Sequence, residues 1–293
     1  MNLEKLGQAV CEMKSALERA ITSATYKGKQ YSDGVQAKRA LICSHTLITL
    51  IHEVVKSSFV DELAGSRLHA IHPPIGKAKP ELKVSGFIKA KDQDIVLLFD
   101  GDEAKRELVS DGPLAGEFDE VGRQQSERSI VLGVRSQMSS VANNFDTLME
   151  RAFAETLNLR LRLPGLVMGE IYVLPIAEYD DAAMARNCVA WKSKPVAIEK
   201  FIRTFTGITG RAAENVTDEF YKYERTALVL ADFRPATPKV FLTLDELKTA
   251  GAVSANFEAD FAKLSPQNFA RDLLAIHRQR HPPGRKVKSQ GPR

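Results

Sequence analysis

The pattern of apolar and polar positions divides the chain into helix-like and strand-like segments. Residues 2–24 and 35–59 carry apolar side chains at helical spacing, which predicts two long amphipathic helices. Short apolar runs at 95–99, 130–134 and 166–176 are bounded by polar residues, which is typical of buried strands. The chain therefore alternates predicted helices and strands, as α/β proteins do.

The segment between the last two of these runs has the clearest organisation. Asn144 precedes a stretch of helical periodicity that ends at Pro164-Gly165. A strand, a long helix and a second strand favour a right-handed crossover between parallel strands. We therefore predict an α/β fold with a central mixed β-sheet flanked by helices.

The rest of the chain gives weaker signals of the same kinds. Polar residues 100–128 predict a long surface connection. Thr243 and Ser265 are candidate helix caps. Further helices are expected at 103–108, 198–206, 244–250 and 266–277, and further strands at 227–231 and 239–242.

These elements suggest one domain over residues 1–277. We expect an N-terminal helical part at 1–60 and a catalytic sheet core at 80–235. The last stretch, 278–293, is rich in Arg and Lys and contains no acid, which predicts a basic flexible tail that can contact phosphates.

Composition narrows the class of protein. With 44% hydrophobic and 27% charged residues, the 293-residue chain has the composition of an ordinary globular protein, and we expect neither a transmembrane helix nor a signal peptide. Cys11, Cys43 and Cys188 lie far apart, which favours the reducing cytoplasm and argues against a zinc site. The net charge of +4 permits an anionic partner. Gly-rich phosphate loops, a serine nucleophile elbow and a zinc-protease motif are all missing from the sequence.

Acidic residues mark the candidate site. Asp94 directly precedes the 95–99 run, Arg135 directly follows the 130–134 run, and Glu155 lies on the predicted helix after it. Glu170, inside the next strand, is costly to bury unless it is paired or binds a cation. One interpretation is a structural ion pair between Arg135 and a glutamate. The other is that Asp94 and a helix glutamate converge on Mg²⁺, which prefers oxygen ligands.

These residues carry a resemblance to a known family. Asp94, the segment Val134-Arg135-Ser136-Gln137, the segment Ala154-Glu155-Thr156-Leu157-Asn158-Leu159 and the strand around Glu170 resemble type II restriction endonucleases of the PD-(D/E)XK nuclease superfamily. The likeness spans residues 91–179. It is greatest to the branch that cuts sites with a CCGG core, in which the second acid has moved to a helix.

The resemblance implies a Mg²⁺-dependent, sequence-specific double-strand DNA endonuclease of a restriction–modification system. Asp94 and Glu155 would hold the metal, and Arg135 would neutralise the scissile phosphate. A homodimer is expected because such enzymes cut palindromes.

Several alternatives remain open from the sequence. Glu150 could replace Glu155 as the helix acid. A second centre could combine Glu81 and Lys83 with Asp92 or Asp94. The strand at 130–134 contains no lysine, which favours a DNA-binding protein or a degenerate nuclease without cleavage. A small-molecule enzyme or an interaction module is the third possibility.

Overall fold

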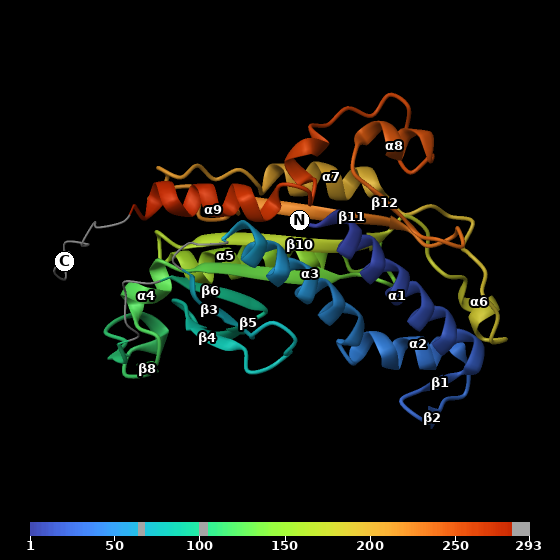
Figure 1. The fold of residues 1–293 in the computed structure, drawn as a ribbon, viewed down its shortest axis with the longest axis horizontal. Coiled ribbons are helices and arrows are strands. Elements are labelled where there is room, and N and C mark those ends of the chain that lie inside the picture. The colour runs from blue at the N-terminus through green and yellow to red at the C-terminus, as the bar shows by residue number, and fades with distance from the viewer. Residues whose placement is uncertain (64–67, 100–104, 283–293) are drawn as a thin grey trace.

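A six-stranded mixed sheet forms the centre of the computed structural model, which describes residues 1–63, 68–99 and 105–282 (Figure 1). β9, β10 and β11 run parallel, and each of the other three strands is antiparallel to its neighbour. The α/β class with a central mixed sheet is therefore confirmed. The strand order is β12 (Lys239–Phe241), β11 (Arg225–Asp232), β10 (Val167–Pro175), β9 (Ile130–Ser136), β6 (Ile95–Phe99) and β3 (Leu68–His72).

The predicted strand–helix–strand unit is present. α5 (Phe145–Arg160) connects β9 to the parallel strand β10, and α7 (Ile198–Gly207) lies on the connection from β10 to β11. Every residue of β10 is buried, because helices cover both faces of the sheet. Full burial of one such aliphatic side chain contributes roughly 1.5–3 kcal/mol.

Helices divide between the two faces of the sheet (Figure 1). The face with Ile171 packs against α1 (Leu3–Ser23), α3 (Thr46–Glu62) and α9 (Phe269–Arg280). The face with Leu174 packs against α5, α7, α8 (Leu244–Thr249) and the 3₁₀ helix η2 (Phe261–Leu264). The chain thus has two apolar layers, one on each side of the strands.

Short helices and strands surround this core. Thr243 begins α8 with a capping box, as its sequence predicts, because its side chain and that of Glu246 satisfy each other's backbone amides. The remaining elements are β1 (Thr25–Tyr26), β2 (Lys29–Gln30), α2 (Gly34–Cys43), β4 (Leu82–Ser85), β5 (Ala90–Gln93), β7 (Glu107–Leu108), η1 (Gly112–Leu114), β8 (Phe118–Asp119), α4 (Arg123–Glu127) and α6 (Asp181–Met184).

The expected single helix at 35–59 is wrong, because the chain forms α2 and α3 with a break between them. Ser44 Oγ donates to the Leu41 carbonyl at 2.7 Å and closes α2. His45 then adopts a left-handed conformation with φ 61°, which redirects the chain into α3.

Three other expected boundaries differ. The prediction of a helix at 103–108 is wrong for its described residues, because Glu107–Leu108 forms strand β7 and pairs with β8. Residues 100–104 lie outside the described part. Asn268, not Ser265, precedes α9. α9 also continues to Arg280, past the expected tail boundary at 278, and residues 283–293 lie outside the described part.

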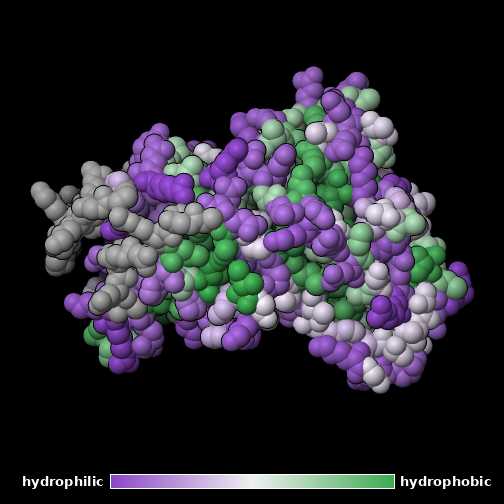
Figure 2. Space-filling view, viewed as in Figure 1, coloured by the Kyte–Doolittle hydropathy of each residue, from purple (hydrophilic) through white to green (hydrophobic). Residues whose placement is uncertain are grey.

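Most of the molecular face in Figure 2 is hydrophilic, with smaller hydrophobic areas between the polar side chains. Among the residues described, no helix has both the length and the apolar composition that crossing a membrane requires.

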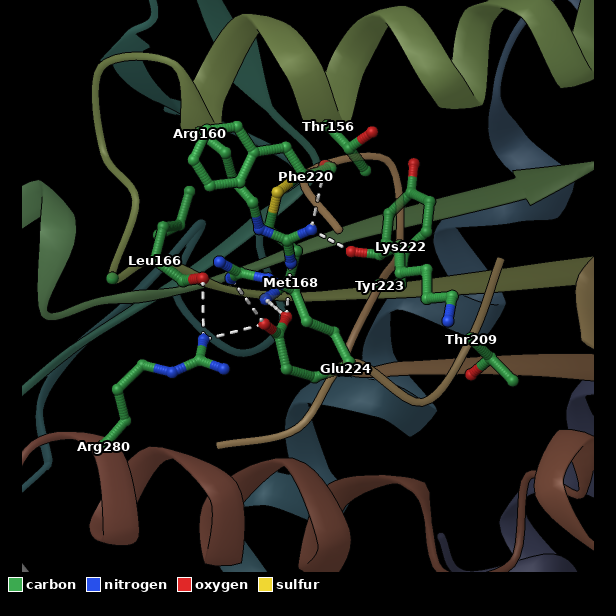
Figure 3. A network of polar contacts seen from close by, with 12 residues as sticks. Thr156, Arg160, Leu166, Met168, Thr209, Phe220, Lys222, Tyr223, Glu224 and Arg280 are labelled. Atoms are coloured by element: carbon green, nitrogen blue, oxygen red, sulfur yellow. Dashed lines mark hydrogen bonds and ion pairs between the residues drawn. The ribbon is translucent and has the colours of Figure 1, made fainter. Parts of the chain in front are cut away.

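A fully buried carboxylate ties three elements together at the amino ends of β10 and β11 (Figure 3). Glu224 accepts from Arg160 of α5 at 2.6 Å, from Arg280 of α9 at 2.7 Å and from Arg211 at 3.2 Å. The Met168 backbone amide donates to it at 2.6 Å. Charge-assisted bonds of this kind fix geometry strongly, and the pairing with Arg280 explains why α9 extends beyond 278.

The substitution Glu224→Gln should destabilise the fold. It leaves three buried guanidinium groups without their counter-charge, which we expect to lower the free energy of unfolding by about 3–5 kcal/mol. Urea unfolding measures this difference. The control Glu258→Gln changes an exposed glutamate and should stay within about 0.5 kcal/mol of the original chain. Equal stability of both variants would contradict a role for Glu224 in holding the helices to the sheet.

Candidate active site

A cleft of about 770 Å³ opens where β9 ends, between the first turns of α3, the middle of α5 and the loop that precedes β4. Ligand sites of α/β proteins commonly lie at the carboxyl ends of parallel strands. Four of the lining residues are Lys or Arg and two are Asp or Glu, so the cleft has a surplus of cations. Its polar lining includes His45, His52, Lys79, Glu81, Lys91, Asp94, Arg135, Arg151 and Tyr172.

Asp94 is held at this cleft by the pairing of two strands. β6 begins one residue later and runs antiparallel to β9, with Ile95 opposite Leu132. The Asp94 carboxylate accepts a hydrogen bond from the Val134 backbone amide at 2.9 Å. The carboxylate is therefore oriented by the backbone of the neighbouring strand.

Arg135 lies between two carboxylates on the α5 side of the sheet. Its Nε donates to Glu170 of β10 at 2.5 Å, and its Nη2 contacts Glu155 of α5. Lys91 of β5 also reaches Glu155, at 2.5 Å. The structure thus brings together Arg135, Glu155 and Glu170, and the expected ion pair between Arg135 and a glutamate is present.

A glycine makes room for Glu170. Gly133 lies directly opposite Glu170 in the β9–β10 register, and a Cβ at Gly133 would fall 2.0 Å from Glu170 Oε2. Any larger residue at this position would displace the carboxylate. No sequence pattern predicts this pairing, because the pairing becomes visible only when the register between the two strands is known.

Two cations and two carboxylates form this cluster. Glu155 pairs with Lys91 and Arg135, and Glu170 pairs with Arg135, while the nearby carboxylate of Asp94 also acts on the charge of Arg135. Burial raises the pKa of Glu170 to about 7 despite the opposing pull of Arg135. Burial also opposes ionisation of Glu155, but Arg135 and Lys91 hold the pKa of Glu155 below its usual value. The carboxylate of Glu170, followed by that of Glu155, raises the pKa of Arg135.

The other candidate residues occupy different places. Glu150 is exposed on α5 and does not line the cleft. Glu81 lines it and pairs with Lys79. Lys83 is exposed on β4, opposite Asp92 of β5. Of this alternative centre, only Glu81 shares the cleft with Asp94.

Two further residues line the cleft, although no sequence motif includes them. His52 lines it, and its Nε2 is buried with no hydrogen-bond partner among the described residues. Tyr172 of β10 also lines it, and its hydroxyl similarly lacks a partner in the described chain. Spacing along one element could not reveal either one, because both face a cleft built from several elements.

The described residues alone do not form a complete set of metal ligands. In the ranges that the structure describes, no three His, Cys, Asp or Glu side chains come together as a metal-binding group. The carboxylates of Asp94 and Glu155 are nevertheless the hard oxygen ligands that Mg²⁺ takes, usually one or two at a time.

Comparison with known proteins leaves the fold and the cleft as the basis for a functional assignment. No protein-family model matches the chain, and neither a curated protein nor a solved structure gives a match.

The raised pKa of Glu170 predicts a specific dependence of stability on pH. A carboxyl group whose pKa is raised by folding stabilises the fold below its unfolded pKa, and this contribution is lost as the pH rises through the folded value. We expect the free energy of unfolding of the original chain, relative to Glu170→Gln, to fall by about 2–3 kcal/mol between about pH 5 and pH 8.

Urea unfolding of both chains across this pH range measures the difference. Glu150→Gln, at an exposed site on α5, serves as the control and should show no such slope relative to the original chain. A constant difference between the original chain and Glu170→Gln would contradict the buried, proton-binding state of Glu170.

Proposed function

We propose that this chain is a Mg²⁺-dependent endonuclease that hydrolyses phosphodiester bonds at a specific sequence of double-stranded DNA. One observation carries the proposal. Asp94 at the start of β6 and Arg135 near the end of β9 line one cleft, and Glu155 of α5 contacts Arg135. The antiparallel strands β3, β6 and β9, then α5 and the parallel strand β10, present these residues in the order that the resemblance to PD-(D/E)XK restriction endonucleases implies.

The donor set is suited to Mg²⁺. Asp94 and Glu155 would hold the ion, with water and phosphate oxygens as the remaining ligands, since Mg²⁺ in nucleic-acid enzymes commonly binds one or two carboxylates. The Lys91 ammonium pairs with Glu155 and would have to release one oxygen of that carboxylate. The Lys91 side chain is partly exposed, so it can move away from Glu155. When bound, Mg²⁺ supplies an activated water and stabilises the charge that develops on phosphate.

The protein residues orient and neutralise the substrate. Lys79 and Arg151 line the cleft and would contact the DNA backbone. Arg135 keeps its charge at every physiological pH, so it can stabilise a phosphate but cannot accept a proton. Glu170 fixes the orientation of Arg135 through its Nε.

The proposed function implies an oligomeric state and a cellular compartment. A homodimer with two-fold symmetry would match a palindromic DNA site and place one cleft on each strand. All three cysteines are free thiols, as expected in the cytoplasm.

A DNA-binding protein without cleavage activity is the second candidate. Both oxygens of Glu155 are engaged by Lys91 and Arg135. In addition, β9 has no lysine where the enzymes that the chain resembles carry one, and Arg135 is the nearest cation. Such a protein would use the same cationic cleft to bind phosphates and would require no metal.

Substitution of the two proposed metal ligands tests the nuclease. Asp94→Ala and Glu155→Ala should each slow Mg²⁺-dependent plasmid cleavage by about 100-fold or more, because each removes stabilisation of the reacting phosphate. Glu150→Ala removes an exposed carboxylate from the same helix and should cleave at the original rate.

The possible results separate the two candidates. Cleavage at the original rate by both Asp94→Ala and Glu155→Ala would remove this site. Salt-sensitive binding of DNA by the original chain, with no cleavage under any metal condition, would instead establish the binding protein.

A further inference from the structure

The hydroxyl of Tyr172 is a buried polar group that has no hydrogen-bond partner in the described part of the chain. Tyr172 is 1% exposed, and among the described residues nothing hydrogen-bonds its hydroxyl. Leaving such a group unpaired is energetically unfavourable, because it loses its hydrogen bonds to water and gains none in the protein. A phenylalanine would pack as well against Phe205, whose ring centroid lies 5.2 Å away, and would avoid this cost.

The position of Tyr172 indicates what its hydroxyl can serve. Tyr172 lies opposite Arg135 in the β9–β10 register, so their side chains project from adjacent strands on the same face of the sheet. Both residues line the cleft, as does the exposed Arg151 of α5. Burial and then the charge of Glu170 raise the pKa of Tyr172, which keeps the hydroxyl protonated and able to donate.

We propose that Tyr172 is a substrate-binding residue whose hydroxyl donates a hydrogen bond to a non-bridging oxygen of the DNA phosphate held beside Arg135. The inference rests on the proposed function and adds a residue to it. Two nitrogens of Arg135 are committed to Glu170 and Glu155, so a neutral donor beside it supplies a contact that the guanidinium cannot make alone. The hydroxyl is covered in the free chain, so a phosphate in the cleft reaches it only after side chains that line the cleft move.

The substitution Tyr172→Phe tests the role because it removes only the hydroxyl. Two properties are measured on the full chain. The first is the midpoint of urea unfolding. The second is the affinity for a fluorescent mixed-sequence DNA duplex in EDTA, where cleavage cannot interfere. We expect the midpoint to stay equal or rise, and the dissociation constant to increase about tenfold, as for loss of a hydrogen bond to a charged group.

Tyr179→Phe is the matched control. Tyr179 is also buried, at 3% exposure, but it lies outside the cleft and stacks on Trp191. Its loss of a hydroxyl should leave DNA affinity unchanged. Mg²⁺-dependent cleavage by the original chain is assayed in parallel.

Each outcome decides the proposal. Unchanged DNA affinity in Tyr172→Phe, with cleavage intact in the original chain, would overturn the role of Tyr172 and leave the nuclease standing. A lower unfolding midpoint in Tyr172→Phe would show that the hydroxyl has a partner within the fold, which also overturns the proposal. If the original chain neither binds nor cuts any duplex, both the inference and the proposed function are overturned.

Discussion

The sharing of one guanidinium by two carboxylates is the interaction on which the cleft depends. Arg135 comes from β9, Glu170 from β10 and Glu155 from α5, so their contacts require the parallel register and the crossover helix at the same time. Gly133 is part of this constraint because only a residue without a side chain leaves space for Glu170. Removing one buried partner from such a cluster leaves an uncompensated charge, which is strongly destabilising.

The two ends of the parallel strands use charge in different ways. At the amino ends, the carboxylate of Glu224 binds three arginines, and backbone carbonyls take up further donors of Arg160 and Arg211 (Figure 3). At the end of β9, cations line an open cleft, and the buried Nε2 of His52 and hydroxyl of Tyr172 have no partner in the described chain. The paired charges at the amino ends stabilise the fold, whereas unpaired polar groups beside a cleft are available to a ligand.

The sequence predicted most of the core and part of the site. Strong apolar runs located β6, β9 and β10, and periodicity located α1 and α5, because burial imposes those patterns directly. The break at His45 was missed because a left-handed residue leaves no periodic signal. Asp94 and Arg135 were found from their positions at strand ends. The Gly133–Glu170 pairing, His52 and Tyr172 were missed because their roles depend on register and on neighbours distant in sequence.

The most direct measurement is digestion of mixed-sequence DNA by the full chain with Mg²⁺, followed by sequencing of the fragment ends. A sequence-specific nuclease gives ends that share one recurrent sequence and that disappear when EDTA replaces Mg²⁺. Intact DNA at every enzyme concentration, or the same ends in EDTA, would contradict a metal-dependent site at Asp94, Glu155 and Arg135.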